Sequence, residues 1–490
     1  MSVARWARRG AGVVIGLALL GLTACDTSTL ARPDQPVVLT GASLPLLVGA
    51  TPERIVAFAH SRPGGTPTWT QVPVQVDQRK VVDFGTVPGS NATPGVTGTV
   101  YGTPAAGVSA LQYADAGTFV GADSDTTFDS NDELVFMASD AGGVVREAEE
   151  TTPAGVVAGS GVRVQLVDPL GNGEVGWVYL FRATPTGGLT PAAGQDYVSY
   201  AFTLTSGAYK TTYKRADGPN PETSLVTGTG YQARLRDRWD DADWRITAGG
   251  ATGVDILDGL KSQFPGTCGR SNITFQDAWG AFVANIDGPV RAIRSYVGAN
   301  SGPYVERTNL FYRDRQEIVT DLRVHAISGV LEFLDYSSAA INMTYRNSVH
   351  PGAVTIDGVP DAIGPELSRW ELVTGNQGSV SVVNRLETSG FPAGQDPADH
   401  VVQYYEDDST PVSQQCWGDA ALLGASGSQV AGSSPTDTIG NTDPRSAPFG
   451  NLRARRTVAY DGPGATGADA ARLADQVDTP LGVTAVAYSP

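Results

Sequence analysis

The sequence predicts an all-β protein of antiparallel β-sandwiches, with long Gly/Pro-rich loops and one short C-terminal helix. Three observations predict this fold class. The chain contains 59 Gly and 31 Pro among its 490 residues, which indicates many turns. Only 17% of its residues are charged, against about 25% in an average chain, so few charged helical faces are expected. Apolar and polar residues also alternate over short segments, which is the period of a β-strand.

The first 25 residues have the order of an export signal. Three arginines precede the apolar stretch 11–20, and the tetrapeptide Leu22-Thr-Ala-Cys25 follows it. This order of charged, apolar and small residues is typical of a secretory signal peptide. The apolar run is shorter than the roughly 20 residues that a membrane span needs. We interpret residues 1–24 as a signal peptide; ordinary secretion and a retained anchor are the alternatives.

The tetrapeptide that ends at Cys25 resembles the lipobox of bacterial lipoproteins. In that family the cysteine is lipidated and becomes the first residue of the mature chain. The resemblance implies an extracytoplasmic lipoprotein of the cell envelope that is anchored to the membrane through Cys25. Residues 25–44 combine small polar residues with Pro33 and Pro36, which predicts a flexible or extended tether.

Charge and cysteine content narrow the functional classes. The net charge is −17, so nucleic acid is not an expected partner, because its binding needs a basic surface. If Cys25 is lipidated, Cys268 and Cys416 remain as an even pair in an oxidising compartment. Such a pair predicts a disulfide, and two buried free thiols are the alternative.

The strand pattern suggests two domains after the tether. A β domain is expected over residues 45–155, before a Gly/Val-rich junction, and a large β-sandwich over residues 160–490. The nearly continuous apolar run 174–181 predicts a strand that is buried on both faces. Residues 467–477 place their apolar side chains on one face and precede Thr479-Pro480, which predicts the C-terminal helix.

The segment Asp287-Gly-Pro-Val-Arg-Ala-Ile-Arg294, with the strands that follow it and the size of this half, is similar to the galactose mutarotase-like supersandwich. The resemblance spans about half of the chain. That fold is common in carbohydrate-active enzymes, so the resemblance implies a carbohydrate-related role. A fold by itself does not specify an activity.

An acidic run is the strongest candidate metal site. Its carboxylates and amide are spaced two apart, as calcium-binding loops often are, but the pattern lacks the glycine and the final glutamate of an EF-hand. A structural Ca²⁺ ion is one interpretation, and a solvated acidic turn whose side chains cap the local backbone is the other. The predicted ligands are Asp123, Asp125, Asp129, Asn131 and Asp132.

Arginine and aromatic residues provide the candidate ligand-binding groups. Guanidinium groups hold oxygen ligands, and aromatic faces stack on sugars or cations. Self-neutralising ion pairs and buried aromatic side chains are the alternative interpretation. The candidate binding residues are Trp239, Trp279, Arg291, Arg294, Tyr304 and Tyr312.

A histidine with a carboxylate could act as a general acid and base on a sugar ring. The candidates for this role are His325, His350 and Glu332. A histidine in a strand is more often a satisfied polar residue. The sequence therefore predicts an anchored β protein that binds a carbohydrate or an envelope component or has a structural role. A lyase, epimerase or hydrolase that acts on carbohydrate is the alternative.

Overall fold

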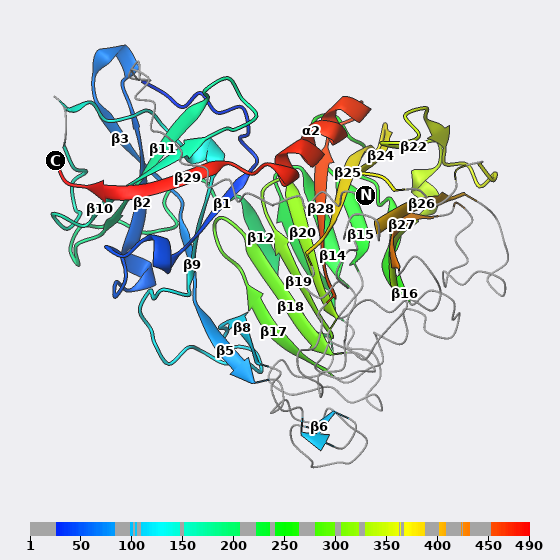
Figure 1. Cartoon of the computed structure of the whole chain (residues 1–490), viewed down its shortest axis with the longest axis horizontal. Coiled ribbons are helices and arrows are strands. Elements are labelled where there is room, and N and C mark those ends of the chain that lie inside the picture. Colours follow the sequence, from blue (N-terminus) through cyan, green and yellow to red (C-terminus); the bar gives the residue numbers. More distant parts are fainter. Residues whose placement is uncertain are drawn as a thin grey trace, which may run out of the picture.

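The computed structural model confirms the predicted fold class: the chain is built from antiparallel sheets, with one α-helix among the residues that the structure describes (Figure 1). The described residues are 26–83, 99–100, 103–104, 109–147, 151–205, 222–235, 241–263, 280–298, 305–322, 329–361, 363, 367–387, 401–407, 423, 425–431 and 452–490.

The first part of the molecule contains a five-stranded sheet and a three-stranded sheet that share an apolar core. Val164, Leu180 and Phe136 lie in this core without solvent exposure. The predicted doubly buried strand is confirmed, because all residues of β11 except the last are buried. The five-stranded sheet has the order β29 (Gly482–Tyr488), β10 (Gly161–Val167), β11 (Val175–Arg182), β2 (Ile55–Ser61), β3 (Thr68–Val72). The three-stranded sheet has the order β1 (Pro36–Thr40), β9 (Glu133–Met137), β4 (Gln75–Asp77).

Sheet pairing does not follow the predicted division between residues 45–155 and 160–490. Strand β11 pairs with β2 across this boundary, and β29 from the C-terminus pairs with β10. The predicted tether is also part of the folded body, since residues 36–40 form β1 and pair with β9. Sequence patterns reveal strands but not their partners, and long-range pairing decides where a domain ends.

The second part is organised around a nine-stranded antiparallel sheet. In order, its strands are β17 (Gly280–Ile286), β18 (Ala292–Gly298), β19 (Val305–Phe311), β20 (Arg315–Leu322), β28 (Leu452–Asp461), β25 (Gly378–Leu386), β24 (Glu371–Gly375), β22 (Thr344–Asn347) and β23 (Val354–Thr355). Two four-stranded sheets accompany it. One contains β12 (Val198–Ala201), β13 (Ser224–Gly228), β14 (Tyr231–Leu235) and β15 (Asp241–Ile246). The other contains β16 (Leu257–Gln263), β21 (Gly329–Tyr336), β27 (Ala425–Ala431) and β26 (Val401–Glu406).

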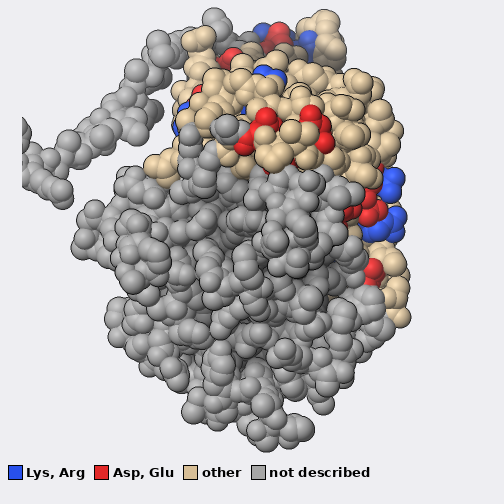
Figure 2. All heavy atoms as spheres, turned by 90° about the vertical axis from the view of Figure 1, so that its right-hand side faces the viewer, with Lys and Arg blue, Asp and Glu red and all other residues tan. Residues whose placement is uncertain are grey.

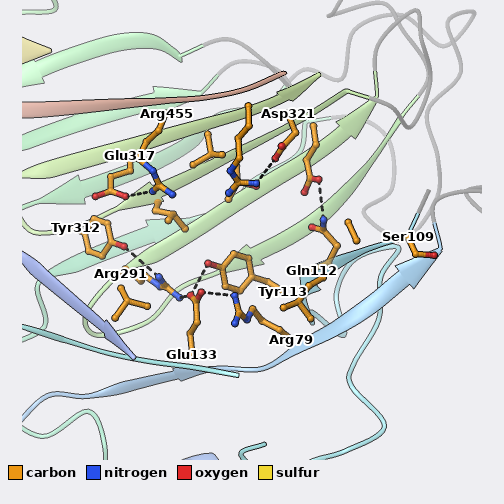
Figure 3. A pocket seen from close by; sticks show the side chains of 18 residues that line it. Arg79, Ser109, Gln112, Tyr113, Glu133, Arg291, Tyr312, Glu317, Asp321 and Arg455 are labelled. Atoms are coloured by element: carbon orange, nitrogen blue, oxygen red, sulfur yellow. Dashed lines mark hydrogen bonds and ion pairs between the residues drawn. The ribbon is translucent and has the colours of Figure 1, made fainter. Parts of the chain in front are cut away.

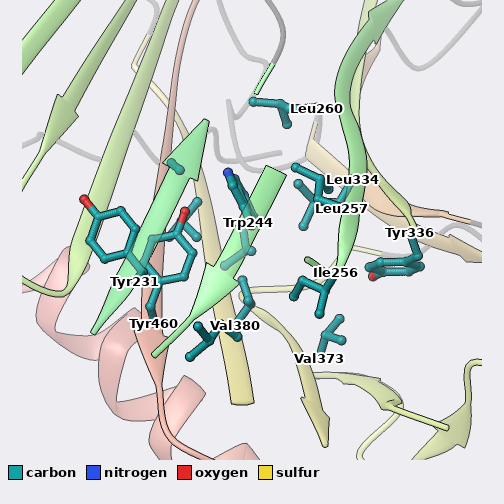
Figure 4. Close-up of a cluster of buried hydrophobic side chains, with 14 of the residues drawn as sticks. Tyr231, Trp244, Ile256, Leu257, Leu260, Leu334, Tyr336, Val373, Val380 and Tyr460 are labelled. Carbon is teal, nitrogen blue, oxygen red and sulfur yellow. The ribbon is translucent and has the colours of Figure 1, made fainter. Parts of the chain in front are cut away.

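One large apolar cluster joins these three sheets (Figure 4). Trp244 is fully buried at its centre, and the rings of Tyr231 and Tyr460 stack with centroids 4.2 Å apart. Ile318 of β20 and Val458 of β28 face the same cluster. One face of the nine-stranded sheet is therefore committed to the core, and the alternate side chains of β20 and β28 point to the other face.

The predicted C-terminal helix is confirmed as α2 (Gly467–Asp478). Thr466 and Asp469 form a capping box at its start, which satisfies free backbone N–H groups. Ala470 and Ala474 are buried against Trp370 and neighbouring apolar residues. The helix ends at the residue before Thr479-Pro480, because proline cannot continue a helix and disfavours the helical conformation of the residue before it.

Smaller elements complete the described fold. Two small two-stranded sheets consist of β5 (Arg79–Asp83) with β8 (Ser109–Tyr113) and β6 (Thr99–Val100) with β7 (Thr103–Pro104). Single 3₁₀ turns occur at Gly41–Ser43, Pro52–Arg54, Pro63–Gly65, Ala138–Asp140 and Ser338–Ala340. Figure 2 shows Asp and Glu side chains dispersed among uncharged residues on the described part of one face. Among the described residues, no helix has the length and apolar character that a bilayer crossing requires.

Candidate functional site

A polar cleft of about 620 Å³ lies between strand β8 and the face of β19, β20 and β28 that points away from the large apolar cluster (Figure 3). Four arginines and four carboxylates line it, together with Gln112, Tyr113 and Tyr312. The arginines are Arg79, Arg291, Arg453 and Arg455, and the carboxylates are Glu133, Glu306, Glu317 and Asp321.

Strand alternation explains how this charged surface forms. Along β20, Glu317, Val319 and Asp321 share one face, while Ile318 and Thr320 point to the other. The register places Val319 opposite Arg455 and Asp321 opposite Arg453 of β28. Strand β19 supplies Glu306 opposite Asp321 on its other side. Charged side chains from three strands therefore form rows across the sheet.

The floor of the cleft is a buried ion-pair network around Arg291. This side chain is 1% exposed, and its guanidinium nitrogen Nη2 lies 2.7 Å from Asp77 Oδ2 and 2.5 Å from Glu133 Oε2. Glu133 also pairs with Arg79 at 2.6 Å and accepts a 2.9 Å hydrogen bond from the Tyr113 hydroxyl. The guanidinium of Arg291 lies 5.3 Å from the centroid of the Tyr113 ring. These contacts hold the floor in one arrangement.

The wall on β28 is more open. Arg453 is 39% exposed and donates to Asp321 at 2.9 Å and to Glu387 at 3.2 Å. Arg455 contacts Glu317 at 2.6 Å and Glu387 at 2.7 Å. Water reaches these two arginines and weakens the pairs, whereas their partners Asp321 and Glu317 are buried.

Electrostatics favour the ionised form of two of the cleft carboxylates, Glu133 and Glu317. Burial opposes the ionisation of Glu133, but Arg291 and Arg79 outweigh it and hold the pKa of Glu133 below its ordinary value. Burial likewise acts against ionisation of Glu317, where Arg315 and Arg455 prevail and lower its pKa. Burial raises the pKa of Tyr312 to about 12, so its hydroxyl stays protonated near neutrality.

The described cleft is therefore equipped to hold a ligand with fixed hydrogen-bond donors and acceptors. Gln112 Nε2 donates to Glu306 at 3.0 Å, and the Ser295 hydroxyl donates to the same carboxylate at 3.1 Å. A general acid must carry a proton at the working pH. The lowered pKa values of Glu133 and Glu317 do not suit either residue to that role.

Two of the predicted binding residues, Arg291 and Tyr312, lie together in this cleft, with 3.4 Å between the Arg291 Nη1 and the Tyr312 hydroxyl. Arg294 lies elsewhere: it is fully buried, pairs with Glu222 and lies 5.4 Å from the centroid of the Phe282 ring. Its position matches the alternative interpretation of a buried ion pair.

The predicted acid/base set is not brought together among the described residues. His350 lies after β22, where its backbone N–H donates to Asn347 Oδ1 at 2.7 Å, and it does not line the cleft. Glu332 belongs to β21, on a different sheet, and nothing is described of its side chain. The other predicted site residues, Cys25, Trp239, Cys268, Trp279, Tyr304, His325 and Cys416, lie outside the described residues.

In the acidic run, the side chains that are described cap local backbone groups. Asp125 Oδ1 accepts from the N–H of Thr127 at 2.9 Å. Asp129 Oδ1 accepts from Asn131 N at 2.7 Å. Asp132 is buried and accepts from the N–H groups of Asp129 and Arg79. No group of three or more His, Cys, Asp or Glu among the described residues has an arrangement that could hold a metal ion. Calcium binding here stays a prediction.

Sequence reasoning missed most of the cleft. The available signal was charge alternation: Arg453 and Arg455 share a strand face, as do Glu317 and Asp321. Each strand by itself looks like an ordinary solvated edge or face. Only the register between β19, β20 and β28 shows that these residues form one surface.

Comparison with known proteins gives no family assignment. No protein-family model matches the chain, and no curated protein matches it. Among solved structures, an alpha-mannosidase from Enterococcus faecalis V583 is similar with a TM-score of 0.41 and 10% identity, over 95% of this chain and 47% of that chain. A protein in the Glycosyl Hydrolase Family 38 from Enterococcus faecalis is similar with a TM-score of 0.40 and 10% identity, over 95% and 49%. The chain thus spans about half the length of these structures.

Proposed function

We propose that this protein binds a neutral carbohydrate, or another polyhydroxylated component of the cell envelope, in the cleft between β8 and the nine-stranded sheet. We further propose that export and lipidation at Cys25 place it at the outer side of a membrane, as the lipobox-like leader implies. The observation that carries the binding proposal is the set of four arginines and four carboxylates in one cleft of about 620 Å³.

The charge balance of the cleft supports an uncharged ligand. Every lining arginine contacts at least one carboxylate. An acidic sugar would have to displace a carboxylate of the protein from its guanidinium partner, and removing one partner of a buried pair is costly. Hydroxyl groups can instead accept from the arginines and donate to the carboxylates without breaking the pairs, and hydrogen bonds to charged groups contribute about 1.5–3 kcal/mol each.

The aromatic residues suit the same class of ligand. Tyr113 lines the cleft and is partly exposed, while Tyr312 is buried at its floor. Ring faces pack well against the apolar faces of sugars, and hydroxyl groups at the ring edge add hydrogen bonds. A carbohydrate-active enzyme remains the second candidate from the sequence, and the same ligand panel tests it.

The test uses the soluble chain of residues 26–490 and a panel of neutral and acidic oligosaccharides, with binding measured by titration calorimetry. We expect binding to neutral members. The Arg453→Ala variant should weaken this binding about 10- to 100-fold, which corresponds to one charge-assisted hydrogen bond. Arg369→Ala is the matched control, because Arg369 is also a partly exposed arginine with two carboxylate partners, Asp475 and Asp478, but lies beside α2.

Three outcomes would contradict the binding proposal. These are no binding by any member of the panel, a preference for acidic members, or an equal loss of affinity in Arg453→Ala and Arg369→Ala. Mass spectrometry of the same mixtures after incubation tests the enzyme candidate. If incubation with the wild-type protein yields shortened or unsaturated oligosaccharides and incubation with Arg453→Ala does not, the function of the cleft is catalysis rather than binding.

A further inference from the structure

The segment that follows the predicted lipidation site is attached to the protein surface along its length. Thr29 N donates to Val175 O at 2.9 Å, and Val175 N donates to the Thr29 hydroxyl at 2.9 Å. Thr27 forms an isolated antiparallel bridge with Gly142, which itself bridges to Trp177 of β11. We call residues 26–35 the strap: it bonds to β11 at Thr29 and, at Thr27, to Gly142, which itself pairs with β11.

Gly176 of β11 leaves room for the strap because it has no side chain. A Cβ atom at Gly176 would lie 2.7 Å from Ser28 Oγ and 2.9 Å from Leu30 Cδ1, both closer than side chains approach one another. Glycine at this position lets the strap pack directly on the backbone of β11. Leu30 in turn contacts the apolar core beneath it. The contact of the strap with the body thus includes apolar packing as well as hydrogen bonds.

Ion pairs fix the strap at two points. Near its start, Asp26 Oδ1 lies 2.6 Å from Arg146 Nη2 and 3.3 Å from Arg62 Nε. Near its end, Arg32 is buried, pairs with Asp168 at 2.6 Å and donates to the carbonyl of Thr479 at 2.7 Å. The second point joins the strap to the β10–β11 turn and to the end of α2.

We propose that the strap holds the body of the protein in a fixed orientation against the membrane, with the surface around Asp26, Arg62 and Arg146 facing the phospholipid headgroups. This inference rests on the proposed lipidation of Cys25, which directly precedes Asp26. A flexible spacer would let the body rotate freely. Here the docked residue next to the lipid places the turn Pro63–Gly65 and residues 142–146 at the bilayer surface, and the two arginines favour anionic headgroups there.

The orientation has a consequence for the cleft. In Figure 1 the described chain begins, in dark blue, beside the β2–β3 hairpin, whereas β5 and β8 lie at the other end of the view. Strand β8 forms one side of the cleft. The anchored protein would therefore turn the β8 side of the cleft away from its own membrane, toward polymers of the envelope.

Hydrogen exchange measured by mass spectrometry tests this inference in two preparations. The first is the soluble chain of residues 26–490, and the second is the lipidated chain in phosphatidylglycerol-containing vesicles. In both, the strap should be protected from exchange. In vesicles alone, the segments 62–66 and 142–147 should gain protection, and residues 109–113 of β8 should not change.

Two variants sharpen the test. A Gly/Ser spacer inserted between Cys25 and Asp26 keeps the anchor but should abolish the added protection of 62–66. Arg146→Ala should loosen only the start of the strap, so that residues 26–28 lose protection in the soluble chain while Thr29 and Leu30 keep theirs through Val175 and the core. The control Arg369→Ala should leave the whole strap protected. Arg146 is 38% exposed, so this replacement does not disturb a core.

The outcomes separate the orientation from the anchoring. An intact mass without acyl chains on Cys25 overturns the anchoring and the orientation with it. A lipidated chain whose strap exchanges like an unfolded peptide overturns the orientation alone. The orientation alone is also overturned if residues 62–66 are equally protected with and without the spacer, or if β8 gains protection in their place.

Discussion

Glu133 and Glu371 are both the first residue of an interior strand, β9 and β24, yet their surroundings oppose each other. Glu133 forms the floor of the cleft, where Arg291, Arg79 and Tyr113 all contact its carboxylate. Glu371 is 1% exposed, and neither of its oxygens makes a hydrogen bond of good geometry to a described residue. The hydroxyls of Ser426 and Tyr345 favour its ionised form, but burial opposes that form more strongly.

The two pKa values move in opposite directions for this reason. Guanidinium groups outweigh burial at Glu133 and lower its pKa. At Glu371, burial outweighs the attraction of Arg456 and raises the pKa to about 7. The comparison teaches that burial does not decide the charge of a carboxyl group by itself. The number of donors that face the carboxyl group decides it.

Removing the partner of Glu133 should have the largest effect on stability. Arg291→Met leaves Asp77 and Glu133 buried without their shared cation, and breaking such a buried pair costs about 3–5 kcal/mol of unfolding free energy. Urea unfolding of residues 26–490 measures this loss. The matched control Arg369→Met removes an arginine that also has two carboxylate partners but is 54% exposed, and it should cost about 1 kcal/mol or less. Equal losses in the two variants would contradict the buried network.

Glu371 should make stability depend on pH. Its folded pKa of about 7 lies above the ordinary value of 4.5, so between these values the folded chain holds a proton that the unfolded chain has lost. The contribution of this residue to stability is therefore full below about pH 4.5, falls by about 1.4 kcal/mol per pH unit up to the folded pKa, and then levels off.

Glu371→Gln should remove this dependence, because glutamine stays uncharged at every pH. Thermal unfolding of wild type and variant at about pH 5 and about pH 8 measures this dependence. Between these two pH values, the unfolding free energy of the variant relative to that of the wild type should rise by roughly 2–3 kcal/mol. A constant difference between the two proteins at both pH values would show that Glu371 is ionised in the fold.

The smallest effect is expected at the open wall of the cleft. Arg453→Ala removes an arginine that is 39% exposed, so the loss of unfolding free energy should be about 1 kcal/mol or less. The same variant should bind ligand less tightly, as described above. A stability loss as large as that of Arg291→Met would assign Arg453 to the structural network of the floor rather than to ligand binding.

Several features were predictable because they depend on neighbouring residues. The nearly continuous apolar run marked the doubly buried β11, and the one-faced, proline-terminated pattern marked α2 within one residue of its end. Pro33 and Pro36 favour extended chain, but they do not specify whether that chain is a free spacer or pairs with a sheet, as residues 36–40 do in β1.

The sequence by itself determined the all-β class and the C-terminal helix, since composition, strand period and local motifs specify these. Only the tertiary structure decided that β29 completes the sheet of β10, that Arg291 meets Asp77 and Glu133, and that the charged faces of β20 and β28 become one cleft. Those contacts join residues more than a hundred positions apart. They depend on strand order and register, which many strands with similar patterns leave open until the whole core is packed.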